Sequence, residues 1–401
     1  MCIRDSFRGA SGGPATVAVM SSGLMGSLSG SAVANTATTG TFTIPMMKSS
    51  GFSSHQAAGL EAAASSGGAL VPPVMGAGAY MMLEIIDPPV SYLEIIRAAL
   101  IPAILYYLSI FLIVHLQTRT FVPAAPEEGS PRAEPWRWEG LIFIAGLSGL
   151  VLFLLMGFSV FRAVSLAMLV VLCCSTLNRR TRLDLKQVSG ALMQASRSGV
   201  ALVSAAASVG IIIGVVTLTG IGARLPALIL PLAQQHLLLA LAALMISSLI
   251  LGMGLPSAVC YLLLATMVGS VLGKLGVAAL AAHLFIFYFG LMSMVTPPVA
   301  LAAYAASSIA GSGFLRSSLA AFRFSLVGFM LPFLFIFRPG LLMLDGQGDL
   351  APPGQITLAV TICLVGLIPM ALALAGSLDR PLTILERVAL GVAALFVLFP
   401  G

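Results

Sequence analysis

The sequence predicts an all-α polytopic membrane protein that contains an inverted-topology repeat. The first observation is composition: the 401-residue chain is 59% hydrophobic and 8% charged, whereas an ordinary soluble domain has about 25% charged residues. The second is an apolar stretch that occurs twice along the chain. The third is that Gly, Ser, Asn, Thr and Pro interrupt each copy where a membrane-spanning helix would normally continue.

The two copies run from Gly26 to Tyr80 and from Gly252 to Tyr304. Their alignment rests on residues that recur with an offset drifting only from 226 to 224: Ser31 with Ser257, Lys48 with Lys274, Pro72 with Pro297, and Tyr80 with Tyr304. So constant an offset is hard to obtain by chance, and it indicates an internal repeat.

Each copy begins with an apolar segment that is too interrupted to be one span. Residues 14–47 are broken at 27–31, and residues 236–273 are broken at 252–257. A lipid-spanning helix needs about 20 apolar residues without exposed irregular backbone. We therefore predict two re-entrant helical hairpins, each entering and leaving on one side of the membrane, with a polar tip between its half-helices.

Each copy continues with a crossing whose helix is discontinuous. Residues 56–86 contain breaks at 65–68 and 72–73, and residues 277–310 contain one at 293–298. Pro lacks a backbone donor and Gly permits unwinding, so both leave carbonyl groups free. Such backbone is tolerated at membrane depth only where it is buried in protein or lines a cavity.

The remaining apolar segments are predicted to be ordinary spans. They are 98–117, 139–158, 160–177, 198–220, 324–338, 356–376 and 382–399. Residues 118–138 form a polar loop, the Arg-rich loop 178–182 leads into an amphipathic segment ending at Arg197, and 224–235 form an interfacial segment with two prolines. The discontinuous crossing at 56–86 and the first four of these spans lie between the two hairpins, so five crossings separate them.

Basic residues orient these crossings. Loop 178–197 is predicted to be cytoplasmic because Arg and Lys concentrate on that side, and counting back two spans places loop 118–138 there too. An odd number of crossings inverts the second copy, so the first hairpin opens to the cytoplasm and the second to the outside. Inverted repeats with discontinuous helices are the architecture of secondary transporters.

This organisation divides the chain into five parts. We expect a partial or non-native start at 1–13, the first hairpin and broken helix at 14–86, scaffold or arm helices at 87–235, the second hairpin and broken helix at 236–310, and C-terminal transmembrane helices, expected to be truncated, at 311–401.

The breaks predict binding chemistry. Half-helix N-termini offer amides to anions, and half-helix C-termini and unwound carbonyls offer oxygen ligands to Na⁺. We expect the tip at 29–35 to face the break at 66–72, and the tip at 252–257 to face 293–296, which gives one ion site per copy with a substrate between the tips. The alternative is that Ser and Thr bond to their own helices while Gly and Pro only shape packing.

Glu61 is the notable acid near a helix interior. Carboxylates inside a membrane are costly and often functional. The alternatives are a side chain that reaches the cytoplasmic interface or one that pairs with Lys48.

The sequence argues against an enzyme and against a nucleic-acid partner. It shows no Ser–His–Asp set, no paired carboxylates at the breaks and no nucleotide-binding Gly loop. Its five cysteines lack CxxC spacing, which disfavours a zinc site or a disulfide framework. The net charge of +6 sits in short loops, as membrane orientation requires. A gradient must therefore drive any transport.

Four motifs resemble the large membrane subunit of tripartite ATP-independent periplasmic (TRAP) transporters. They are SGSAVANTATTGTFTIPMMK at 29–48, EAAASSGGALVPPVMGAGAY at 61–80, LGMGLPSAV at 251–259, and AAHLFIFYFG with TPPVALAAYAASSIAG at 281–311. The resemblance covers most of the chain and is to the branch in which small and large membrane subunits are fused and work with TAXI-type solute receptors. It implies an elevator-type fold in the bacterial inner membrane.

The resemblance also implies a function. This is Na⁺-coupled uptake, by alternating access and without a cofactor, of a small organic acid delivered by a periplasmic TAXI-type receptor. The fused small-subunit helices that this chain lacks would precede it. One sodium site would involve Ser29, Ser31, Asn35, Gly67 and Pro72, the other Gly254, Ser257, Val295, Thr296 and Pro297, and the substrate would contact Ser31, Asn35, Thr38 and Ser257.

Two other functions stay open at this point. One is a stand-alone ion-coupled organic-anion symporter of similar architecture, which would need no soluble receptor. The other is a non-transporting membrane scaffold subunit, which would show neither transport nor stabilisation by a substrate.

Overall fold

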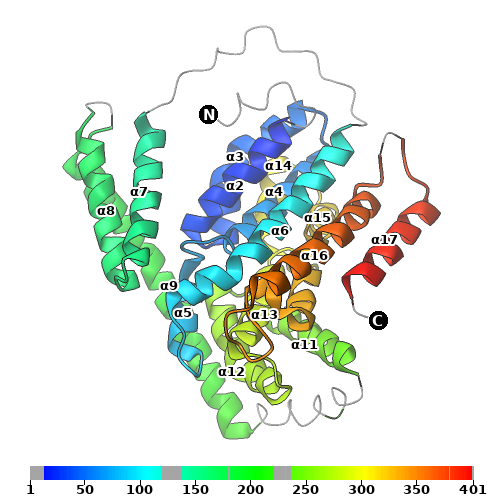
Figure 1. Cartoon of the computed structure of the whole chain (residues 1–401). Helices are drawn as coiled ribbons and strands as arrows, with labels where there is room; N and C mark the ends of the chain where they lie inside the picture. The colour runs from blue at the N-terminus through cyan, green and yellow to red at the C-terminus, as the bar shows by residue number, and fades with distance from the viewer. Residues whose placement is uncertain are drawn as a thin grey trace. The chain divides into compact units, whose positions relative to one another are not determined.

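The computed structural model describes residues 13–119, 138–178, 181–220, 231, 236–378 and 380–399. These residues are mostly helical and divide into two compact units. One unit holds α7 (Trp138–Leu155), α8 (Val160–Thr176) and α9 (Leu185–Thr219) as far as Ser208. The other unit holds the remaining described helices, including both copies of the repeat (Figure 1).

The helices of the two copies correspond one to one in order and spacing. The first copy forms α2 (Gly13–Ser29), α3 (Ala32–Ser49), α4 (Ser54–Gly68) and α5 (Gly76–Ile85), and the second forms α11 (Leu237–Gly252), α12 (Ser257–Lys274), α13 (Ala279–Met292) and α14 (Leu301–Ala310). Helices α4 and α13 begin 225 residues apart, as do α5 and α14. Met75 before α5 and Ala300 before α14 both have positive φ, 55° and 37°. The Pro72–Pro73 and Pro297–Pro298 peptide bonds are both cis.

Each copy contains a helical hairpin interrupted where the sequence predicts. Helices α2 and α3 pack against each other and are joined by Gly30 and Ser31. Helices α11 and α12 also pack together and are joined by residues 253–256. Gly30 has a φ of 62° and Gly254 a φ of 80°, a region that favours glycine. Both hairpins therefore turn at a residue that adopts positive φ without steric strain.

The predicted break at 65–68 is wrong. These residues complete α4, and the unwound segment is 69–75. Gly67 is helical, and its lack of a side chain makes room for a neighbour: an added Cβ there would lie 2.1 Å from the Tyr106 ring. The helix ends instead before Pro72 and Pro73, which cannot donate to a helical ladder.

Helix α4 is the centre of the larger unit. It packs against α2, α3, α14 and α15 (Phe314–Phe337), and residues 57–70 are all buried. Small residues permit this crowding: an added Cβ on Gly59 would lie 2.5 Å from Cβ of Ala320. Close approach through small residues is typical of membrane helix contacts, where van der Waals packing replaces a hydrophobic driving force.

Three of the described helices are long and apolar enough to cross a membrane, by length and composition. They are α6 (Tyr92–Thr118), α15 (Phe314–Phe337) and α16 (Pro353–Ala375). The predicted separation of an amphipathic segment from a span at 198–220 is wrong, because α9 is one helix with no proline between Leu185 and Thr219. The interfacial segment 224–235, apart from residue 231, and most of loop 118–138 lie outside the described residues.

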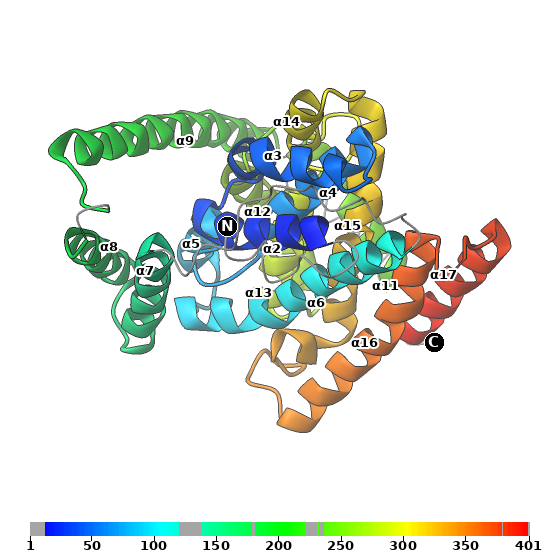
Figure 2. The same cartoon turned by 90° about the horizontal axis from the view of Figure 1, so that it is seen from above.

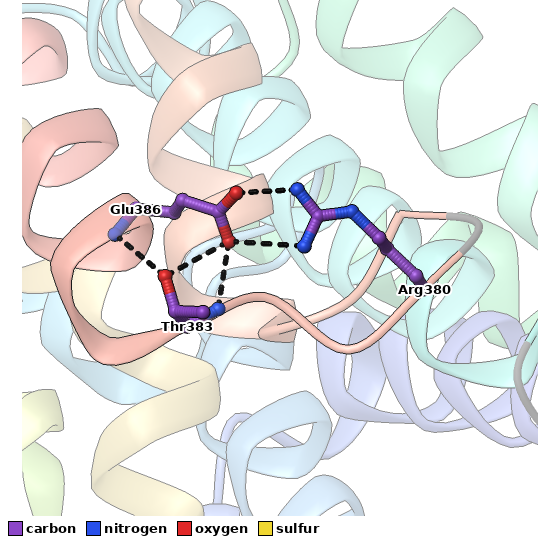
Figure 3. A network of polar contacts seen from close by, with 3 residues as sticks. All are labelled: Arg380, Thr383 and Glu386. Atoms are coloured by element: carbon purple, nitrogen blue, oxygen red, sulfur yellow. Dashed lines mark hydrogen bonds and ion pairs between the residues drawn. The ribbon is translucent and has the colours of Figure 1, made fainter.

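Helices α16 and α17 (Ile384–Leu398) lie side by side (Figures 1 and 2). A capping box starts α17: Thr383 Oγ1 accepts from Glu386 N at 3.3 Å, while Thr383 N donates to the Glu386 carboxylate at 2.8 Å. Figure 3 shows Arg380 completing this network through an ion pair with Glu386 at 2.5 Å. Capping residues satisfy the amides that a helix start leaves unpaired.

Candidate functional site

The tip of the first hairpin touches the starts of two other helices. An added Cβ on Gly30 would lie 2.2 Å from Cα of Gly76, the first residue of α5. Ser257, the first residue of α12, donates its hydroxyl to the Gly30 carbonyl at 3.3 Å. The tips of the two hairpins, one from each copy, are therefore in direct contact.

Each hairpin also contacts the broken helix of its own copy at equivalent positions. In the first copy, an added Cβ on Gly26 would lie 2.5 Å from Cα of Gly68. In the second, Ser293 donates its hydroxyl to the carbonyl of Gly252 at 3.1 Å. Gly252 follows Gly26 by 226 residues and Ser293 follows Gly68 by 225, so one contact is built twice. In the second copy this contact joins residues of the predicted tip and break, whereas in the first copy it joins two helical residues, Gly26 of α2 and Gly68 of α4.

Asn35 is the predicted site residue with the most unusual surroundings. Its side chain is fully buried, and its Nδ2 donates to the carbonyl of Ser22 at 2.8 Å. Its Oδ1 has no hydrogen-bond partner among the described residues. Native structures rarely leave a buried polar atom unsatisfied, so this oxygen has the capacity to accept one more hydrogen bond or to bind a cation.

Other predicted residues near the first tip make local contacts. Ser31 caps α3 by accepting from Ala34 N at 3.3 Å, and Ser29 Oγ accepts from Ser31 N at 3.4 Å. Gly67 is buried and its carbonyl accepts from Leu70 N at 2.9 Å. Pro72 is half-buried in the unwound segment.

The predicted residues of the second copy are less closely gathered. Gly254 is exposed, and Ser257 reaches across to the first copy rather than to its own break. Val295 is buried, and Thr296 donates its hydroxyl to the carbonyl of Met292 at 2.7 Å, within its own turn. Pro297 is half-buried. For Thr296 the structure therefore fits the alternative in which the hydroxyl serves its own helix.

The predicted substrate residues lie in three different settings. Ser257 contacts the tip beside Ser31, and Asn35 is buried one turn into α3. Thr38 is exposed and donates to the carbonyl of Ala34 at 2.8 Å, within its own helix. The structure thus brings Ser31 and Ser257 to the contact of the two tips and leaves Thr38 on the outside of α3.

Sequence reasoning singled out Glu61 but missed its partners. Glu61 is fully buried, and hydroxyls from three helices bind its carboxylate, those of Ser22, Thr39, Thr43 and Ser65. The spacing was a usable signal, because Thr39 with Thr43 and Glu61 with Ser65 each lie four residues apart on one helix face. Lys48 does not pair with Glu61, since its Nζ donates to the carbonyl of Ala310 at 3.1 Å.

Two comparisons with known proteins bear on this arrangement. The family described as "Tripartite ATP-independent periplasmic transporter, DctM component" matches residues 6–346, which include both copies of the repeat. A protein of Haemophilus influenzae named as a TRAP transporter large permease is 45% identical to the chain over 62 residues. That alignment spans 16% of this chain and 15% of the relative.

Proposed function

Since the chain belongs to the DctM family of tripartite ATP-independent periplasmic transporters, and is therefore a TRAP permease component rather than an enzyme, we propose that it couples sodium entry to the uptake of a small organic acid. The acid is delivered by a periplasmic TAXI-type receptor. The fused small-subunit helices complete the permease in the bacterial inner membrane, and the two hairpins alternate access to the site. The aligned segment spans only 15% of the curated relative, so the activity of the whole protein is part of this proposal.

The observation that carries the proposal is the unpartnered Oδ1 of Asn35. Leaving a buried acceptor unsatisfied costs about 1–3 kcal/mol. An amide oxygen is a hard ligand that suits a hard cation, and it lies where hairpin α2–α3 meets the end of α4. The hydroxyls of Thr36 on α3 and Ser66 on α4 are also buried without a partner in the described part of the chain.

The contact of the two tips supports a substrate site at the same place. Helices α3 and α12 both begin there, with Ser31 as the N-cap of α3 and Ser257 as the first residue of α12. Helix N-termini attract anions because their first amides are unpaired and the helix dipole is positive there. An organic carboxylate held between Ser31 and Ser257 would thus contact both copies.

Sodium binding can be tested without knowing the substrate. The melting temperature of the purified protein is measured in NaCl and in choline chloride at equal ionic strength. Sodium should stabilise the wild type, by about 2.7 kcal/mol at one hundred times its Kd. Asn35→Leu should lose most of this sodium-specific gain, whereas Thr41→Val, an exposed hydroxyl on the same helix, should keep it.

Transport gives the second arm of the test. In proteoliposomes, uptake from a panel of labelled organic acids should require both the receptor and an inward sodium gradient. Equal melting temperatures in the two salts, or uptake without sodium, would refute the coupling. Uptake without the receptor would instead identify a stand-alone symporter.

A further inference from the structure

The carboxylate of Glu61 lies in a cage of hydroxyl groups. Oε1 accepts from Ser22 Oγ at 2.7 Å, Thr39 Oγ1 at 2.5 Å and Ser65 Oγ at 3.1 Å, and Oε2 accepts from Thr43 Oγ1 at 2.6 Å. The five side chains come from α2, α3 and α4 and are all buried. The cage therefore joins both arms of the first hairpin to the central helix through one ionisable group.

Cations on the surrounding helices are committed elsewhere. Lys48 of α3 donates to the carbonyl of Ala310, and the guanidinium of Arg323 on α15 donates to the carbonyls of Leu374 and Ala375. Arg316, also on α15, lines a shallow pocket. No ion pair of Glu61 is present among the described residues. A charged Glu61 is thus stabilised by hydroxyl donors alone, which is costly at membrane depth.

The tyrosines and histidines near α4 also have partners of their own. Tyr106 and Tyr107 of α6 donate to the carbonyls of Ala63 and Ala64 at 2.9 and 2.6 Å. His283 of α13 bonds to Tyr261 at 2.7 Å. His55 on α4 itself lies at its N-terminal end beside Ser53, and α14 carries only the exposed Tyr304, while the sequence of α2 has no titratable residue. Protonation of the cage therefore falls to Glu61.

The hydroxyl geometry satisfies both protonation states. With Glu61 charged, all four hydroxyls donate to it. With Glu61 neutral, its O–H can donate to Thr39 or Thr43, because each threonine can turn its own hydrogen to a carbonyl of its helix. Thr39 Oγ1 lies 2.8 Å from the Asn35 carbonyl, and Thr43 Oγ1 lies 2.9 Å from the Thr39 carbonyl. Binding the proton therefore strands no buried donor or acceptor.

The second copy of the repeat serves as an internal comparison. The positions equivalent to Glu61, Thr39 and Ser65 are Ile286, Ala265 and Gly290. Ser248 stands at the position of Ser22, and its buried hydroxyl has no partner in the described part of the chain. The same helix contacts are thus built without an acid, so the fold of the repeat does not require the cage.

We propose that Glu61 and its four hydroxyl partners, none of which is among the predicted sodium ligands, form a proton-binding site that takes up and releases one proton as the protein works. Protonation transfers a proton from water to Oε1 or Oε2 and changes no other covalent bond. The hydroxyl oxygens stand at hydrogen-bond distance from the carboxylate, so a proton fits without any rearrangement of the helices.

Infrared difference spectroscopy of the purified full chain tests this site directly. Lowering the pH should produce the carbonyl stretch of a buried carboxylic acid, and raising it should abolish that band. Glu61→Gln should remove the band. Glu84→Gln, which replaces an exposed carboxylate on α5 that accepts from Tyr80, should leave it intact.

A second variant keeps the test valid where Glu61→Gln does not fold. Thr43→Val removes the donor to Oε2 but keeps the side-chain shape, so the acid band should persist to higher pH, by roughly one pH unit. The proposal would be overturned if the acid band remained in Glu61→Gln. It would also be overturned if the wild type showed no acid band, or a band that did not change with pH, over its whole stable pH range. Loss of the band when NaCl replaces choline chloride at constant pH would make the cage a sodium site instead. The pH-dependent readouts depend neither on sodium coupling nor on transport.

Discussion

The hydroxyl of Ser257 lies 3.3 Å from the carbonyl oxygen of Gly30, although 227 residues separate them in the chain. This hydrogen bond joins the start of α12 to the tip between α2 and α3, and so ties the second copy of the repeat to the first. The place where the two copies meet is thus held by polar groups at helix ends rather than by apolar side chains alone.

Removing this bond should weaken the contact of the two tips. Ser257→Ala deletes one hydroxyl, and a typical intramolecular hydrogen bond contributes about 0.5–1.5 kcal/mol to the free energy of unfolding. We expect a loss in that range, together with a lower rate of uptake. Denaturant unfolding in detergent measures the first and proteoliposome uptake the second. Ser247→Ala is the control, since the hydroxyl of Ser247 donates to the carbonyl of Ala243 in its own helix; an equal effect of both changes would contradict the tip contact.

Gly30 should tolerate no side chain. Its φ of 62° disfavours other residues, and an added Cβ would lie 2.2 Å from Gly76. Gly30→Ala should therefore lower the free energy of unfolding by more than about 2 kcal/mol, because backbone strain and the clash add. Gly273→Ala on α12, where an added Cβ meets nothing within 4 Å, should be neutral or stabilising. Melting temperatures of the two variants decide; a stable Gly30→Ala protein would be inconsistent with this geometry.

Tyr106 should be important for packing as well as for hydrogen bonding. Its buried hydroxyl donates to the Ala63 carbonyl at 2.9 Å and lies 3.3 Å from Ser325 Oγ. Tyr106→Phe removes this hydrogen bond, so the free energy of unfolding should fall by about 0.5–1.5 kcal/mol. Tyr304→Phe is the matched control, because Tyr304 is 60% exposed. Equal melting temperatures for wild type and Tyr106→Phe would argue against the bond.

Lys48 should stabilise the end of α14 in the other copy. Its Nζ donates to the carbonyl of Ala310, the last residue of that helix, where the helix dipole favours a cation. Lys48→Met keeps the apolar stem and should cost about 0.3–1 kcal/mol of the free energy of unfolding. For Lys274, the equivalent residue, the structure gives no hydrogen bond within the described part of the chain, so Lys274→Met should cost less. A reversed order of the two variants, read from unfolding curves, would contradict this role.

Much of the fold was predictable because the same glycine and proline positions recur in both copies of the repeat. The offset between Pro72 and Pro297 places both unwound segments, and the glycines at 30 and 254 mark both hairpin turns. Local chemistry decides these features, since Pro cannot donate a backbone hydrogen bond and Gly accepts positive φ. The helix end at Gly68 was misplaced for the opposite reason: Gly67 serves close packing on Tyr106 rather than unwinding.

The candidate site was predictable only in part. Asn35 and Ser257 were chosen from motifs, and the structure gives both of them distinctive surroundings. The pairing of Ser22 with Glu61 was not predicted, because it depends on how α2 packs against α4. Contacts between helices arise from side-chain shape at the interface, which no spacing along one helix specifies.

By itself, the sequence determined that this protein is a membrane protein with a twofold internal repeat, two helical hairpins and two unwound helices, because composition, glycine and proline act locally. Tertiary structure alone decided which of these pieces meet. It placed the carbonyl of Gly30 against Ser257, gave the amide oxygen of Asn35 no partner among the described residues, and enclosed Glu61 in hydroxyls from three helices. These outcomes depend on packing between segments far apart in the chain, where a difference of one ångström makes or removes a hydrogen bond.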